Sequence, residues 1–159
     1  MFLKAKGTPV VYTYASSSKP SMNITVFTDG GSRGNPGLAA CAYFIYNDQQ
    51  DVLHKEGKFL GQKTNNEAEY QAFIESLVWI HENFKLQKIE KITWKLDSLL
   101  VVEQLSRHWK IKEARLALLA QSAWKVMDEM GIPYVIQHVP RALNAAADQL
   151  VNETLDSRT

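Results

Sequence analysis

The chain has 159 residues, of which 45% are hydrophobic and 22% are charged, so it can form one domain with a buried core. Its net charge of +1 does not by itself indicate a nucleic-acid-binding protein, and the single cysteine, Cys41, excludes an internal disulfide and a multi-cysteine metal site. No apolar stretch reaches transmembrane length and the N-terminus lacks a signal peptide, so we expect a cytoplasmic protein with no membrane partner.

Positive charge is concentrated in one part of the chain. Residues 85–125 contain nine Lys or Arg and four Asp or Glu, which is a surplus of five positive charges. This surplus could be an electrostatic footprint for phosphate, but a solvated helix face explains it equally well.

The first half of the chain favours strands. Residues 1–21 have no sustained period and are expected to form a flexible tail, with a short extended piece at 9–12. The alternating patterns predict strands at about 24–28, 39–46 and 52–60, and a glycine-rich loop separates the first two. Three strands in meander order are expected to pair antiparallel.

The pattern then changes to a helical period. Thr64 and Glu67 form a capping-box sequence ahead of a long apolar stripe, and Gly131 is typical of a helix end. We expect helices at about 66–83, 98–106, 113–130 and 142–155, and strands at 89–96 and 134–139. Alternation of strands and helices implies right-handed crossovers with parallel pairing. The prediction is therefore an α/β domain over residues 22–157, with three antiparallel strands, two parallel strands and helices on both faces.

Four carboxylates have notable positions in this layout. Asp29 ends the first strand, Asp97 ends the fourth, Glu69 lies in the first turn of the long helix and Asp148 lies within the last helix. Three of them have an ordinary explanation when taken alone: a hairpin turn for Asp29, a favourable helix dipole for Glu69 and solvent exposure for Asp148. If all four converge, they repel one another unless cations neutralise them, and hard oxygen ligands suit Mg²⁺ or Mn²⁺.

The sequence resembles the type 1 ribonuclease H (ribonuclease HI) family in four motifs, which occur in family order and spacing from about residue 24 to 155. They are Thr28-Asp29-Gly30-Gly31-Ser32-Arg33-Gly34-Asn35-Pro36-Gly37, Thr64-Asn65-Asn66-Glu67-Ala68-Glu69-Tyr70, Leu96-Asp97-Ser98, and His138-Val139-Pro140-Arg141 through Asn144 to Asp148. Any one motif would be weak, but the four together are specific. The resemblance implies the ribonuclease H-like fold.

The resemblance also implies an endoribonuclease that acts on RNA–DNA hybrids, and we expect it to be a monomer. Asp29, Glu69, Asp97 and Asp148 would hold two Mg²⁺ ions, or Mn²⁺, with Asp29 bridging both. Hydrolysis of the RNA strand would leave 5′-phosphate and 3′-hydroxyl ends. Glu69 is the implied ligand of the second motif, while Glu67 keeps its capping role.

Further site residues are carried over from the same motifs. His138 would assist proton transfer or product release, although a strand-end histidine with no task is the alternative. The implied substrate contacts are Gly30, Gly31, Asn35, Thr64, Asn65, Asn66 and Asn144. Asn35 and Asn66 could instead be turn and cap residues, and Asn144 could orient the Asp148 ligand rather than the substrate.

Two positions depart from the pattern of many bacterial members. Leu99 stands where some carry a polar residue that touches RNA, and residues 107–112 replace a basic insertion, as in members without this protrusion. Three other functions remain open: a catalytically silent binding module of the same fold, a DNA-directed member such as a resolvase or transposase domain, and a piece of a reverse transcriptase.

Overall fold

The computed structural model describes residues 21–84 and 89–158. The predicted tail, including the extended piece at 9–12, therefore lies outside the described residues except for residue 21, and the division into tail and domain stays a prediction. In the part of the chain that is described, no helix has the length and apolar character needed to cross a membrane.

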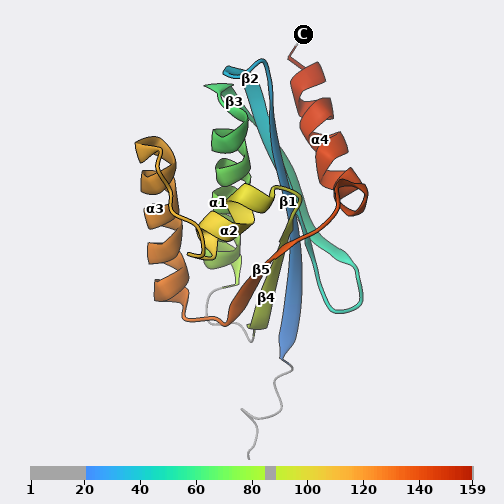
Figure 1. The fold of residues 1–159 in the computed structure, drawn as a ribbon. Helices are drawn as coiled ribbons and strands as arrows, with labels where there is room; N and C mark the ends of the chain where they lie inside the picture. The colour runs from blue at the N-terminus through green and yellow to red at the C-terminus, as the bar shows by residue number, and fades with distance from the viewer. Residues whose placement is uncertain (1–20, 85–88, 159) are drawn as a thin grey trace, which may run out of the picture.

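A five-stranded mixed sheet forms the centre of the protein (Figure 1). Its strands are β1 (Met22–Arg33), β2 (Gly37–Tyr46), β3 (Val52–Lys63), β4 (Ile89–Leu96) and β5 (Tyr134–His138), in the order β3-β2-β1-β4-β5. β1–β2 and β2–β3 pair antiparallel, whereas β1–β4 and β4–β5 pair parallel. The predicted fold class is confirmed, and β1 is the central strand.

Helices cover both faces of this sheet. They are α1 (Asn65–Asn83), α2 (Leu99–Leu105), α3 (Ala114–Met130) and α4 (Ala145–Asp156). α1 packs on β1 and β2, with α2 and α3 on the same side, and α4 packs on the opposite face against β1, β2 and β3 (Figure 1).

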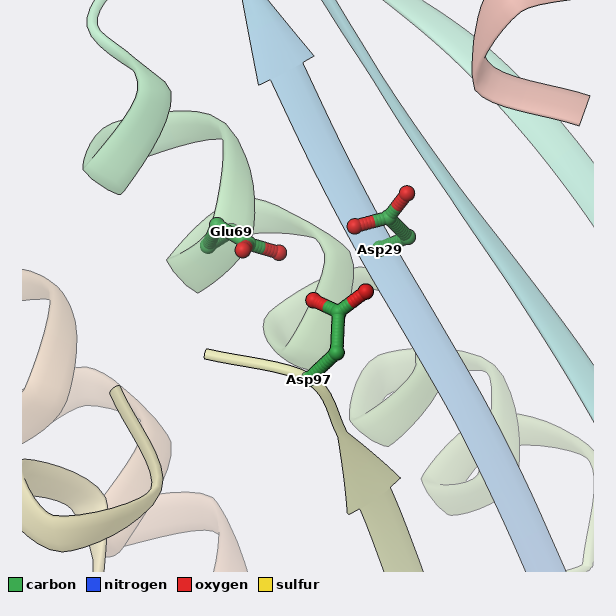
Figure 2. A group of neighbouring side chains, drawn as sticks. All are labelled: Asp29, Glu69 and Asp97. Atoms are coloured by element: carbon green, nitrogen blue, oxygen red, sulfur yellow. The ribbon is translucent and has the colours of Figure 1, made fainter. Parts of the chain in front are cut away.

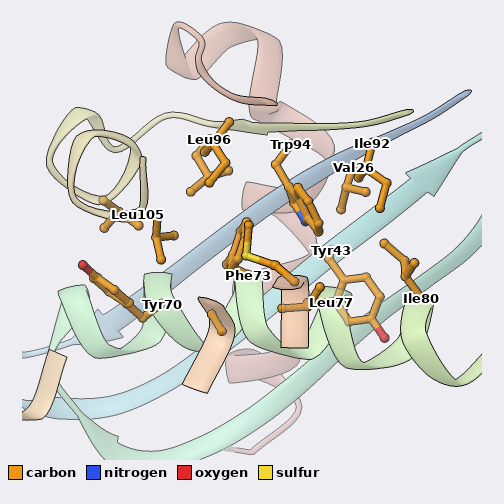
Figure 3. Close-up of a cluster of buried hydrophobic side chains, with 14 of the residues drawn as sticks. Val26, Tyr43, Tyr70, Phe73, Leu77, Ile80, Ile92, Trp94, Leu96 and Leu105 are labelled. Atoms are coloured by element: carbon orange, nitrogen blue, oxygen red, sulfur yellow. The ribbon is translucent and has the colours of Figure 1, made fainter. Parts of the chain in front are cut away.

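The main core lies between the sheet and α1 (Figure 3). Alternation along β1 turns Ile24 and Val26 toward α1, whose Phe73 packs on Trp94 at 4.6 Å between ring centroids. The buried Trp94 indole donates a hydrogen bond to Ser76 Oγ at 2.9 Å, so its polar atom is satisfied inside the core. Fully burying one such apolar side chain contributes roughly 1.5–3 kcal/mol, so this face fixes where α1 lies.

The glycine-rich stretch is not the predicted loop. β1 continues to Arg33, and Asp29 pairs in register with Ala42 of β2 instead of ending its strand. The reversal comes at residues 34–36, where Gly34 has a φ of +104°. On its other side, β1 pairs in parallel with β4, and the last pair of residues is Phe27 with Lys95. Asp29 lies two residues beyond this pair, at the carboxyl edge of the two parallel strands.

The predicted capping box at the start of α1 is confirmed. Thr64 Oγ1 accepts from the Glu67 backbone N–H at 3.1 Å, and Glu67 Oε1 accepts from the Thr64 backbone N–H at 2.9 Å. The second oxygen of Glu67 accepts from Arg115 of α3 at 3.1 Å. Burial alone would raise the pKa of Glu67, but the hydrogen bonds from Thr64 and Arg115 lower it overall.

The last helix begins later than predicted. Residues Arg141–Asn144 form a 3₁₀ turn after Pro140, and α4 starts only at Ala145, so Asp148 lies in its first turn and not within its middle. The side chain of Asn144 is buried and its Nδ2 donates to the Thr28 carbonyl of β1 at 2.9 Å. This hydrogen bond places the start of α4 beside Asp29.

The connection between α2 and α3 is short and held at both ends. Gln104 Nε2 donates to the Lys110 carbonyl at 3.3 Å, and Trp124 Nε1 donates to the Leu105 carbonyl at 2.9 Å. Arg107, at a φ of +67°, places its guanidinium 4.4 Å from the centre of the Trp124 ring. The chain thus passes from α2 to α3 without a protruding insertion.

Close packing of α1 on β1 predicts different effects for two adjacent glycines. A Cβ at Gly30 would lie 2.2 Å from the Ala68 backbone carbon, whereas a Cβ at Gly31 would meet Val151 at an ordinary 3.5 Å. We expect Gly30→Ala to lower the free energy of unfolding by about 1–3 kcal/mol or more, and Gly31→Ala to change it much less. Urea unfolding of the two variants checks this. Equal stabilities would show that α1 can shift without strain.

Candidate active site

Three carboxylates meet at the carboxyl edge of the parallel strands (Figure 2). Asp29 comes from β1, Asp97 directly follows β4 and Glu69 points from α1 toward both. One oxygen from each lies within 4.8 Å of the others. The predicted convergence is therefore found for these three residues, because parallel pairing of β1 and β4 brings Asp29 and Asp97 together.

Glu69 reaches this cluster because Gly30 has no side chain. The backbone of α1 passes so close to β1 at this point that any larger residue would strike Ala68 and Glu69. The Gly30 backbone N–H donates to Glu69 Oε1 at 2.9 Å, which orients the carboxylate. Gly30 thus positions Glu69 through its backbone N–H, and the substrate contact that the resemblance implies for Gly30 stays a prediction.

Asp148 lies beside this group but outside the 4.8 Å cluster. It lines the same hollow as Asp29 and Glu69, from the first turn of α4 on the other face of the sheet. It is close enough to Asp29 to contribute to the raised pKa of that residue. The structure therefore places the fourth predicted carboxylate at the rim of the cluster, next to Asp29.

The electrostatics of the cluster favour a bound cation. Burial, then repulsion from Asp97 and Asp148, raises the pKa of Asp29 to about 7. Burial and repulsion from Asp29 and Asp97 also raise the pKa of Glu69 well above its ordinary value. Asp97 Oδ2 is buried and has no hydrogen-bond partner among the described residues. A divalent cation would offset this repulsion and supply a partner for that oxygen, so the donor set fits a hard metal ion.

The two remaining residues of the last motif lie in different environments. His138 is the exposed final residue of β5, in register with Leu96, the residue before Asp97. Asn144 is only 1% exposed, and the substrate contact that the resemblance implies for it stays a prediction. Its hydrogen bond to Thr28 instead supports the alternative, that it positions the helix carrying Asp148.

Asparagine side chains connect the β1–β2 turn with the start of α1. Asn35 Oδ1 accepts from the Asn65 backbone N–H at 3.0 Å, and Asn65 Oδ1 accepts from the Ser32 backbone N–H at 2.8 Å. Both asparagines are exposed, and their side-chain NH₂ groups make no hydrogen bond to the described part of the chain. Asn66 is half-buried in the first turn of α1, and the Thr64 hydroxyl accepts the capping bond.

Two arginines at the site received no role from the sequence. Arg141, in the 3₁₀ turn before α4, and Arg33, at the end of β1, line the same hollow as Asp29 and Asp148. Arg33 is paired with Asp156 at 2.7 Å. Arg33 lies in the same motif as Asp29, and Arg141 lies in the same motif as Asp148. The closeness of each arginine to an acidic site residue in the sequence is the signal that could have identified them. Leu99, which stands where some family members carry a polar residue that touches RNA, is 44% exposed.

The raised pKa values predict that stability without metal falls as pH rises. The folded protein binds more protons than the unfolded chain between about pH 4 and 7, so stability is lost as pH rises through about 7. In chelator at pH 8, we expect Asp29→Asn to be more stable than wild type by on the order of 1–3 kcal/mol, and we expect a smaller difference at pH 5, where the Asp29 carboxyl group of the folded protein is still protonated. Urea unfolding at both pH values measures this, with Asp128→Asn, an exposed acid of α3, as the matched control. A variant less stable than wild type at pH 8 contradicts the repulsion.

Comparisons with known proteins agree with this arrangement. Residues 27–154 match the family described as reverse transcriptase-like. A ribonuclease HI of Halobacterium salinarum is 33% identical over 150 residues, covering 94% of this chain and 73% of that protein. The crystal structure of LC11-RNase H1 in complex with an RNA/DNA hybrid superposes with a TM-score of 0.80 at 36% identity, covering 85% of this chain and 98% of that one.

A bifunctional protein of Mycobacterium tuberculosis is 38% identical over 138 residues, which is 86% of this chain. The chain spans only 36% of the length of that relative, so the similarity concerns one part of a longer protein. Since the similarity to the archaeal ribonuclease HI instead runs through most of both chains, this protein belongs to the type 1 ribonuclease H family.

Proposed function

We propose that this protein is an endoribonuclease that hydrolyses the RNA strand of RNA–DNA hybrids and leaves 5′-phosphate and 3′-hydroxyl ends. The observation that carries the proposal is the cluster of Asp29, Glu69 and Asp97, within 4.8 Å of one another at the edge of the parallel strands. Membership of the ribonuclease H family supports it. A cytoplasmic, monomeric enzyme is part of the same proposal.

Asp29, Glu69, Asp97 and Asp148 are the residues that would hold two Mg²⁺ ions, with Mn²⁺ as the alternative. Asp29 would contact both ions, a role supported by its place in the cluster with Glu69 and Asp97 and by its electrostatic interaction with Asp148. When bound, the ions would activate a water for attack on phosphorus and stabilise charge on the leaving 3′ oxygen. The protein's part is to hold the four carboxylates in place through Gly30, Asn144 and the packing of α1.

Selection of a hybrid would depend on contacts to the 2′-hydroxyls of the RNA strand in a wide minor groove. Asn35 and Asn65 use their carbonyl oxygens within the protein, which leaves their NH₂ groups to donate to a ribose hydroxyl. Gly31 and Asn66 lie beside them. The Thr64 hydroxyl accepts the capping bond but keeps its proton, so it can still donate to a phosphate of the DNA strand.

Cleavage assays with labelled RNA–DNA hybrid, duplex RNA and duplex DNA test the proposal. We expect Mg²⁺-dependent cleavage of the hybrid only, loss of cleavage in EDTA and in Asp29→Asn, and wild-type turnover in Asp128→Asn. Binding without cleavage by the wild type would favour the silent module, and cleavage of duplex DNA would favour the DNA-directed alternative. Turnover by Asp29→Asn at the wild-type rate would remove that residue from the site.

His138 would act as an assisting group rather than a metal ligand, since it is exposed at the end of β5 beside Asp97. We expect His138→Ala to lower turnover by about 10²- to 10⁴-fold, less than the loss of a carboxylate, and to leave Mg²⁺ binding unchanged. Single-turnover cleavage and calorimetric Mg²⁺ titration measure the two effects, with His81→Ala on the exposed end of α1 as control. A loss of metal binding would require the site to be redrawn.

A further inference from the structure

Part of the sheet face that carries α4 is not covered by any described helix. α4 packs where β1 and β3 present glycines, with Val151 over Gly31 and with Leu150 and Thr154 over Gly57. On the same face, on the other side of the turn that begins α4, the strands continue without a helix above them (Figure 1). Because Ile24 and Val26 face α1, alternation turns the intervening residues toward this open region. By the pairing register, the outward residues of this region include Thr25, Phe27, Phe44, Tyr46, Lys55, Lys91, Thr93 and Lys95.

Three aromatic rings of this region form a continuous row. Phe27 and Tyr46 meet edge-on, with centroids 5.8 Å apart at 86°, and Phe44 and Tyr46 lie nearly parallel at 6.1 Å and 14°. All three side chains are only half-buried. Rings that are held by one another and by the sheet lose little conformational freedom when a ligand packs on them.

A small hollow continues the row toward α4. It is lined by Phe27, Tyr46, Leu143, Asn144, Ala146 and Ala147. Leu143 is 63% exposed although it belongs to the 3₁₀ turn that begins this helix. The hollow gives the aromatic row an apolar wall at its end.

Positive charge borders the rings. Lys95 Nζ lies 5.5 Å from the centre of the Phe27 ring, and Lys55 Nζ lies 5.7 Å from the centre of the Phe44 ring. Lys91 faces the same way on β4. None of the outward residues named above carries a carboxylate. The surface therefore combines ring faces with cations, which suits a ligand that has flat π-systems and negative charges in alternation.

We propose that this aromatic and basic face, defined by Phe27, Phe44, Tyr46, Lys55 and Lys95, binds single-stranded nucleic acid. Bases would stack on the rings while the lysines contact phosphates, as on other sheet platforms for single strands. Phe27 lies two residues before Asp29 on the same face of β1, so a strand on this surface would run toward the catalytic cluster. The face would hold an unpaired tail of a hybrid substrate, and only this use of it rests on the proposed nuclease function.

Binding is tested without catalysis. A fluorescein-labelled short oligodeoxythymidylate is titrated with protein in EDTA and followed by fluorescence anisotropy, with Phe44→Leu/Tyr46→Leu as the variant. We expect affinity to fall about tenfold or more, because base stacking on aromatic side chains is removed while apolar volume is retained. Phe59→Leu is the matched control: Phe59 is a half-buried ring of β3 with Arg158 at 4.3 Å, but it lies beside α4.

A second variant tests the lysines separately, so that the proposal does not depend on the folding of the leucine variant. Lys55→Gln/Lys95→Gln should reduce the slope of log affinity against log salt by about 0.7 for each phosphate of a single strand that the lysines no longer neutralise. Lys125→Gln, on the exposed side of α3, should leave the slope unchanged. Thermal unfolding of all variants establishes that they are folded.

Cleavage of hybrids with and without a single-stranded tail tests whether this face contributes to binding of the substrate. We expect the tail to lower KM for wild type and to have no effect in the leucine variant, with equal turnover of the blunt hybrid by both. Unchanged oligonucleotide affinity in both variants overturns the proposal. So does dimerisation of the wild type in sedimentation that the leucine variant abolishes, because the face would then be an interface between two copies.

Discussion

The contact between α1 and β1 at Gly30 is the constraint on which the site depends. Two backbones meet there without a side chain between them, and the contact of Phe73 with Trp94 of the neighbouring strand β4 helps to pack α1 on the sheet. A helix carrying Glu69 can approach a strand carrying Asp29 only at such a point. Apolar packing of the core thus determines the separation of two charged groups that, by themselves, would move apart.

This arrangement works against the stability of the protein without cations. The fold buries the carboxylates and holds them close together, and the raised pKa values of Asp29 and Glu69 reflect the free-energy cost of this burial and of their mutual repulsion. Cation binding would offset part of that cost, so folding and cation binding are thermodynamically linked. Glu67, on the same turn of the helix, is in the opposite situation because Thr64 and Arg115 satisfy its charge. Two glutamates two residues apart on one helix therefore have different tasks.

Sequence reasoning found most of the fold because each prediction relied on a local signal. The capping box located the start of α1, Gly131 located the end of α3, and alternation located the strands. It failed where a distant partner decides the outcome. Gly30 and Gly31 look like a turn, yet pairing with β2 extends the strand through them. The hydrogen bond from the buried Asn144 side chain to the Thr28 carbonyl likewise depends on a partner far away in the chain, so no local signal in the sequence indicates it. The carboxylates could be identified from the motifs, whereas the place of Asp148 at the rim required the packing of α4.

The short connection between α2 and α3 has a consequence for how such a protein can diverge. The hydrogen bonds of Gln104 and Trp124 fix both ends of the connection from the helix side, and neither depends on the identity of the residues between them. The entropic cost of closing an anchored surface loop rises only slowly as the loop becomes longer. The segment can therefore gain or lose residues while the four acids, which lie on other elements, keep their geometry. Affinity for a charged polymer and the rate of the chemical step can then change independently in this architecture, one through loop length and the other through the sheet edge.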